Sequence, residues 1–118
     1  MLTRRELLAS SLAAAAAKYQ PVLLGQAYVW TQHLARRKQP LADSLDEVLG
    51  GFARAGFRNL ELMAEYFTPA LREKTAALLA RHHLGLPVVY RGGPMHIAAE
   101  AEKTVAAVAA LADIVKPL

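Results

Sequence analysis

Glu61 stands inside the apolar run formed by Leu60, Leu62 and Met63. Burying a carboxylate in a core is costly unless the charge is paired or is used by a site. Successive side chains of a strand alternate between two faces, so a strand that buries Leu60 and Leu62 turns Glu61 to the opposite face. We therefore expect Glu61 either to pair with a basic neighbour such as Arg91 or to contact a ligand.

Arg91 ends another apolar run and begins the segment "RGGPMH". Its planar fork of donors fits phosphate and carboxylate groups. Glycine amides just before a helix can also hold an anion, because the positive end of the helix dipole favours negative charge. Arg91 is therefore a candidate ligand-binding residue, and His96 in the same segment is another.

The other histidines differ in their expected surroundings. His33 follows the first apolar run, in a predicted loop, and is a further candidate, whereas His82 and His83 are adjacent on a predicted helix and their side chains must diverge. The chain has no cysteine, which excludes disulfides, thiolate nucleophiles and cysteine zinc sites. We predict no metal-binding residue within this chain.

The composition is that of one folded domain. Of 118 residues, 54% are hydrophobic and 20% are charged, a balance that is typical of globular chains. The formal net charge is +4, but the basic residues are dispersed apart from the segment 35–39. Since a basic stripe with interleaved aromatic residues is missing, we predict no nucleic-acid partner.

The first seventeen residues, "MLTRRELLASSLAAAAA", have paired arginines before a short alanine-rich run and resemble a twin-arginine export signal. This layout predicts a periplasmic or exported protein. The run is far shorter than the ~20 apolar residues of a membrane-spanning helix, so we expect no stable membrane anchor. The alternative is an ordinary N-terminal helix of a cytoplasmic protein, because alanine and leucine favour helix.

Three short apolar runs are predicted strands, 22–30, 57–63 and 86–91, and amphipathic segments follow each of them. The helices are expected from Asp43 to about Gly56, from Thr68 to about His83, and over 96–113. The expected inner face of the first helix consists of Leu45, Val48, Leu49 and Phe52. That of the third helix consists of Ile97, Ala101, Val105, Val108 and Ala112.

Local signals support these helix limits. Ser44 and Glu47 have the spacing of a capping box, and Thr68 before Pro69 is typical of an N-cap with proline at the first helical position. Gly56 and Gly85 stand at corresponding points where the first two helices are expected to end in the left-handed conformation.

The alternation of strands and helices predicts an α/β fold with a parallel sheet made of three (βα) units, because parallel strands require crossover connections and are buried on both faces. Both an open doubly wound sheet and a barrel of eight such units satisfy this pattern.

Two segments carry a family resemblance. "SLDEVLGGFARAGFRNLELM" resembles the first helix and second strand of the sugar phosphate isomerase/epimerase family, the xylose isomerase-like barrels, through Ala55, Gly56, Phe57, Glu61 and Leu62. "LLARHHLGLPVVYRGG" is similar to the next unit of that family. The resemblance implies that residues 18–118 form a partial TIM-barrel-type fold, less than half of a barrel of about 250 residues.

The resemblance also implies a function. A complete member interconverts sugars by metal-assisted proton transfer through an enediolate, with the divalent metal held by residues of later strands. This chain alone is therefore expected to be inactive. The substrate pocket would be lined by Glu61, Arg91, Trp30 and Tyr28, with His33 and His96 on the same face.

Two alternatives remain open at this point. One is a small, non-catalytic α/β binding or regulatory domain of the flavodoxin-like type. The other is a half-barrel that associates with a copy of itself or with another fragment, since three strands leave two unpaired sheet edges.

Overall fold

The computed structural model describes residues 3, 5–6 and 20–118. The export signal predicted for residues 1–17 lies largely outside the described residues and stays a prediction. Within the described part of the chain, none of the helices combines the length and the apolar character that crossing a bilayer requires.

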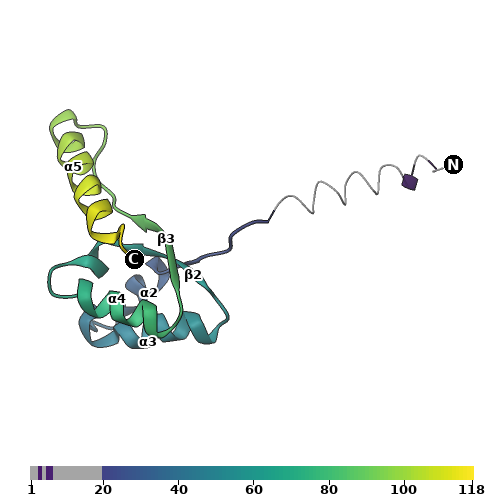
Figure 1. Ribbon diagram of the computed structural model, residues 1–118. Helices are drawn as coiled ribbons and strands as arrows, with labels where there is room; N and C mark the ends of the chain where they lie inside the picture. The colour runs from purple at the N-terminus through teal and green to yellow at the C-terminus, as the bar shows by residue number, and fades with distance from the viewer. Residues whose placement is uncertain (1–2, 4, 7–19) are drawn as a thin grey trace.

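A three-stranded parallel sheet forms the centre of the fold (Figure 1). Its strands are β1 (Gly25–Gln26), β2 (Asn59–Met63) and β3 (Gly85–Tyr90), in the spatial order β1-β2-β3. The prediction of an α/β fold with a parallel sheet is therefore confirmed. β1 and β3 are the edges of this sheet.

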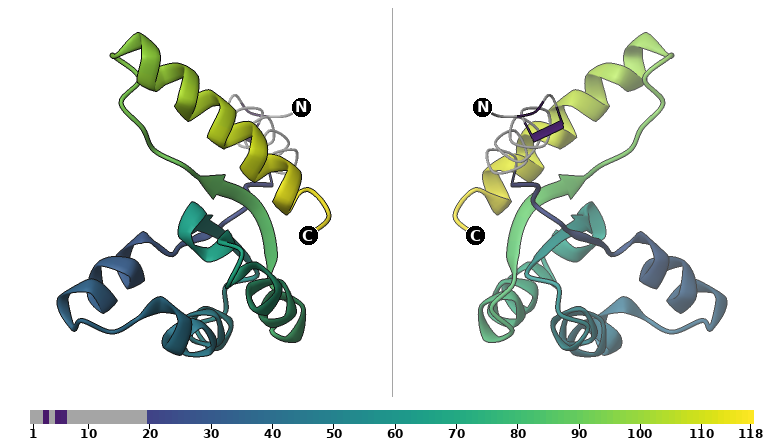
Figure 2. Two further views of the ribbon diagram at one scale, coloured as in Figure 1. Left: turned by 90° about the vertical axis from the view of Figure 1, so that its left-hand side faces the viewer. Right: turned by 90° about the vertical axis from the view of Figure 1, so that its right-hand side faces the viewer.

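The helices lie in the connections between these strands and after them. They are α2 (Tyr28–Arg36), α3 (Leu41–Arg54), the 3-10 helix η1 (Ala64–Phe67), α4 (Arg72–Arg81) and α5 (Ala98–Val115). α3 and α4 lie side by side in both views of Figure 2, and they pack against each other. Both views also show that α5 rises away from this pair.

The core lies between the sheet and the α3–α4 pair. Its fully buried members include Leu45, Val48 and Leu49 of α3 together with Leu60 and Leu62 of β2. The period of the predicted first helix therefore identified the correct buried face. This packing fixes one face of β2 against the helices and leaves its other face open for polar side chains.

Close contact between α3 and β1 depends on a glycine. A Cβ atom on Gly25 would lie 2.6 Å from Cε1 of Phe52 and 3.3 Å from Cδ2 of Leu60. Gly25 thus faces the helix side of the sheet together with Leu60. Because strand side chains alternate, Gln26 and Glu61 lie on the opposite face.

The predicted first strand was too long. Only Gly25–Gln26 forms a strand. Tyr28–Trp30, expected to end the strand, and the residues up to Arg36, expected to form a loop, make up α2 instead. The backbone N–H of Ala27 still donates to the carbonyl of Glu61, at 3.0 Å, and the carbonyl of Ala27 then accepts from Thr31. Strand pairing therefore ends at Ala27, and the amphipathic segment after it gains its hydrogen bonds as a helix instead.

The predicted helix starts were also wrong in detail. α3 begins at Leu41 after Pro40, so Ser44 is a buried residue inside the helix and forms no capping box. α4 begins at Arg72, and the carbonyl of Thr68 accepts from Leu71 and Arg72 while its side chain makes no cap bond. A tight turn at the carbonyl of Thr68 replaces the expected N-cap.

One of the two predicted helix-ending glycines is confirmed. Gly56 has φ +90°, the left-handed conformation that favours glycine. Gly85, by contrast, is the first residue of β3, and His83 with φ 54° takes the left-handed position after α4. The backbone of Gly85 instead lies close to β2, because a Cβ atom there would be 2.7 Å from Oδ1 of Asn59.

The packed face of α5 differs from the predicted one. Leu111 is its buried residue, and the helix packs against η1. Val105 is 58% exposed and Val108 is 45% exposed, although both were expected on the inner face. The helix itself was predicted correctly, but the rest of the chain packs against the face that contains Leu111 and not against the predicted face.

Candidate functional site

The three strands end at the same edge of the sheet because they are parallel, and a hollow of about 490 Å³ lies there. We call it the sheet-end hollow. Its lining comes from α2, from the segment after β2 and from the end of β3, and consists of Tyr28, Thr31, Gln32, Met63, Ala64, Glu65, Thr68, Tyr90, Arg91 and Gly92. An adjoining hollow of about 280 Å³ extends over the open face of the sheet and is lined by Gln26, Tyr28, Met63 and Tyr90.

Glu61 points away from the helices, as predicted, because its neighbours Leu60 and Leu62 are fully buried on the other face. Its partner is not Arg91. Nε2 of Gln26, on the adjacent strand, donates to Oε1 of Glu61 at 2.9 Å. The half-buried carboxylate thus accepts a hydrogen bond from an amide, and of the two alternatives for Glu61 the pairing with Arg91 is wrong.

Arg91 follows directly after β3 and lines the sheet-end hollow. The side chain is exposed, and no ion pair joins it to a carboxylate among residues 20–118. It is the only basic residue in the lining, and Glu65 is the only acidic one. Its guanidinium is therefore available to an anionic group in the hollow.

The two aromatic candidates, Tyr28 and Trp30, lie in different surroundings. Tyr28 lines both hollows and is 49% exposed. Trp30 packs partly buried against the core, near Gly51 of α3, and its ring meets that of His33 edge-on at 5.9 Å. Tyr28 is therefore in position to contact a ligand, whereas Trp30 has a packing role.

Neither candidate histidine lines the sheet-end hollow. His33 is exposed on α2, beside Arg37, and His96 is exposed in the segment before α5. No group of three histidine, aspartate or glutamate side chains within the described residues is arranged to hold a metal ion.

Several lining residues were missed from the sequence. Thr31 and Gln32 belong to α2, which was expected to be a loop, and Glu65 and Thr68 lie around η1. Tyr90 precedes Arg91 at the end of a predicted strand. This position is the sequence feature that could have identified Tyr90 as a lining residue.

η1 contains a buried tyrosine hydroxyl. The Tyr66 side chain is fully buried, and its hydroxyl has no hydrogen-bond partner of good geometry. Burial raises the pKa of Tyr66, while the nearby Thr31 hydroxyl partly opposes this and the charge of Glu65 adds to it. Oγ1 of Thr75 donates to the carbonyl of Tyr66 at 2.8 Å, which ties η1 to α4.

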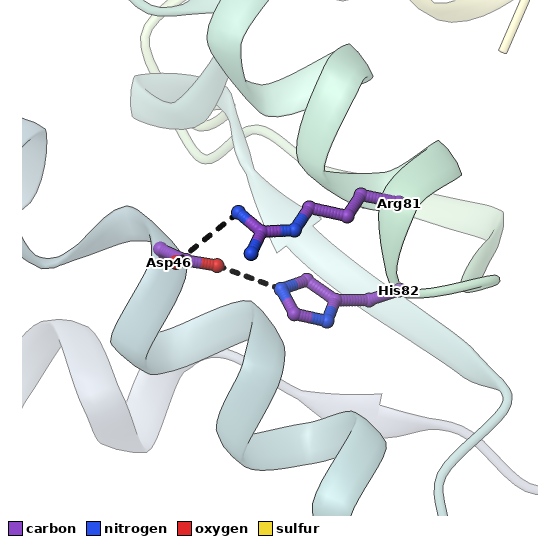
Figure 3. A network of polar contacts seen from close by, with 3 residues as sticks. All are labelled: Asp46, Arg81 and His82. Carbon is purple, nitrogen blue, oxygen red and sulfur yellow. Dashed lines mark hydrogen bonds and ion pairs between the residues drawn. The ribbon is translucent and has the colours of Figure 1, made fainter.

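A polar network joins α3 to the end of α4, away from the hollow (Figure 3). Nε2 of His82 lies 2.7 Å from Oδ1 of Asp46, and Nη1 of Arg81 lies 3.6 Å from Oδ2. The hydrogen bond from His82, aided by Arg81, lowers the pKa of Asp46. The network connects α3 to the end of α4. The contact with Asp46 explains the position of His82 as structural and not as part of a ligand site.

Comparison of the chain with protein-family models, curated proteins and solved structures found no match. The family resemblance therefore depends on the short motifs of two segments, the one around Gly56 and Glu61 and the one over residues 78–93, and it belongs with the proposals below.

Proposed function

We propose that this chain supplies the first βα units of a barrel of the sugar phosphate isomerase/epimerase type, and that its sheet-end hollow holds part of a sugar substrate. The observation that carries this proposal is the hollow at the shared end of three parallel strands, where aromatic, hydroxyl, amide and guanidinium groups converge. Barrel enzymes bind their substrates at this end of the strands.

The strand order argues against a flavodoxin-like sheet, and it fits both a barrel and the first half of a doubly wound 3-2-1-4-5-6 sheet. β1, β2 and β3 are neighbours in chain order, and the crossover helices α3 and α4 pack together on one side of the sheet. A flavodoxin-like order would place the first strand between the second and the third. The described topology therefore favours a barrel-type repeat over the flavodoxin-like alternative.

Five of the lining residues have a role in this proposal. Tyr28 and Tyr90 provide rings against which the apolar face of a sugar can lie, and Gln32 and Thr68 offer hydrogen bonds to its hydroxyls. Arg91 binds a phosphate or carboxylate on the substrate through charge-assisted hydrogen bonds.

No group of three suitable side chains for a metal occurs among the described residues, and Glu61 already accepts a hydrogen bond from Gln26. We therefore assign these residues to binding and orienting the substrate, and no chemical step to this chain. Export through the twin-arginine-like segment 1–17 is a separate part of the proposal.

Saturation-transfer NMR on the 118-residue chain tests the binding role, with an aldose, a ketose and their phosphate esters as probes. We expect binding of a sugar phosphate, a clear loss of signal in Tyr28→Ala, and loss of the phosphate preference in Arg91→Ala. The matched control is Arg36→Ala, which removes an exposed arginine of α2 outside the hollow. Absence of binding by every probe, or equal effects of Arg91→Ala and Arg36→Ala, would contradict the proposal.

A non-catalytic α/β binding domain is the second candidate. The continuous core that the sheet shares with α3 and α4 favours it, because such a core can support cooperative folding without further units. It predicts cooperative urea unfolding of the chain together with no response to any of the sugar probes.

A further inference from the structure

The exposed face of α5 carries a regular apolar pattern that its own chain does not cover. The spacing between its successive residues alternates between four and three positions. We call this set the α5 seam, and it consists of Ala101, Val105, Val108, Ala112 and Val115. This is the a/d spacing of helices that pair with other helices. Of these five, only Val115 packs against the core cluster, and it does so partly.

The neighbouring stripe of α5 is the one that its own chain occupies. Leu111 is buried near η1, and Thr104 lies against the backbone of Gly93 while its hydroxyl donates to the carbonyl of Glu100 at 2.9 Å. α5 is therefore held on one side, and the α5 seam remains accessible beside it. Figure 2 shows the helix at the outside of the molecule.

The α5 seam continues into a groove of about 470 Å³ between the helix and the segment after β3. The groove is lined by Tyr90 and Met95 together with Val105 and Val108. The Tyr90 side chain is 52% exposed and that of Met95 is 59% exposed. This extends the accessible apolar surface beyond the helix itself and gives a partner side chain a place to insert.

We propose that the α5 seam pairs with the α5 seam of a second copy of this chain, with the two helices antiparallel. In this register Val105 lies opposite the partner's Val115, and Val108 lies opposite the partner's Ala112. The small alanines let the two helices approach closely. The proposal follows from the fold alone and does not depend on the proposed sugar-binding function.

Charge complementarity favours a second copy of this chain as the partner of the α5 seam. Glu102 and Lys116 flank the α5 seam on the same side, both are exposed, and neither forms an ion pair with another residue of the described chain. The antiparallel register brings Glu102 beside the partner's Lys116, and twofold symmetry makes this contact twice. A parallel pairing would leave both charges opposite apolar residues.

The interface has few layers, so its area falls below the ~800 Å² per partner of a standard stable complex. Association is accordingly weak and depends on protein concentration. Sedimentation equilibrium of the 118-residue chain over a wide concentration range measures this association directly.

Charge reversal tests the register. Glu102→Lys and Lys116→Glu each replace two attractions by two repulsions, and each raises the dimer dissociation constant about tenfold. The double variant Glu102→Lys/Lys116→Glu restores both contacts in reverse and returns the constant to near that of the unaltered chain. Glu47→Lys, on the exposed surface of α3, changes the net charge equally and leaves dimerisation unchanged.

These variants alter exposed side chains, and far-UV circular dichroism confirms that each is folded. A chain that is monomeric at every concentration overturns the proposal. So does a dimer that the two reversals leave intact, since its contact would then lie elsewhere, for example at the free edge of β3. Failure of the double variant to restore dimerisation rules out the antiparallel register.

Discussion

Gln26 and Glu61 join the edge strand β1 to the central strand β2 through a side-chain hydrogen bond of 2.9 Å. The two residues are paired in the sheet register, so their side chains stand next to each other on the open face. β1 consists of only two residues, which makes this contact a large part of its attachment to the sheet.

Replacement of Gln26 should therefore weaken the fold. Gln26→Ala leaves the half-buried Glu61 carboxylate without its amide donor, and we expect the free energy of unfolding to fall by about 1 kcal/mol. Urea denaturation measures this value. Gln32→Ala, an exposed glutamine on α2, is the matched control and should change stability little. Equal losses in both variants would show that the contact with Glu61 contributes nothing.

A paired comparison of glycines tests the packing of β1 against α3. Gly25→Ala places a methyl group 2.6 Å from the Phe52 ring and should cost about 1–3 kcal/mol. Gly51→Ala, inside α3, meets Trp30 at 3.5 Å and Arg54 at 4.0 Å, both ordinary contacts, and should stabilise by about 0.5–1 kcal/mol. Thermal melts of the two variants should therefore shift in opposite directions, and a stable Gly25→Ala protein would refute this account of the contact.

Asp46 gives the stability of the fold a dependence on acid pH. Its pKa is lowered in the folded state, so its contribution is fully present above its ordinary pKa of about 3.9 and is lost as the pH falls through the lower folded value. Asp46→Asn should reduce the melting temperature near neutral pH, and the difference from the unaltered protein should shrink below pH ~4. Asp113→Asn, exposed on α5, should show no comparable convergence.

The buried hydroxyl of Tyr66 and the hydrogen bond to its carbonyl should respond oppositely to mutation. Tyr66→Phe removes a hydroxyl without a partner of good geometry, and should be neutral or raise the free energy of unfolding by up to about 1 kcal/mol. Thr75→Val removes the donor to the carbonyl of Tyr66 with little change of shape and should cost about 1–2 kcal/mol. Chemical denaturation of the two variants measures both values, and a large loss in Tyr66→Phe would indicate a partner for its hydroxyl.

Local sequence determined the elements whose signals are short in range. The helical period of Leu45, Val48 and Leu49 identified the buried face of α3, and the alternation around Glu61 identified the two faces of β2. Gly56 ended its helix as expected because a positive φ is a local property of the backbone.

Tertiary structure decided what depends on distant partners. Tyr28–Trp30 became helical because β1 loses its pairing after Ala27, and Gln26 became the partner of Glu61 through the register between strands. For α5, the apolar pattern was visible in the sequence, but which of its faces packs depends on where η1 lies. A local pattern fixes which side chains share a face, whereas contacts between segments far apart in the chain determine what that face meets.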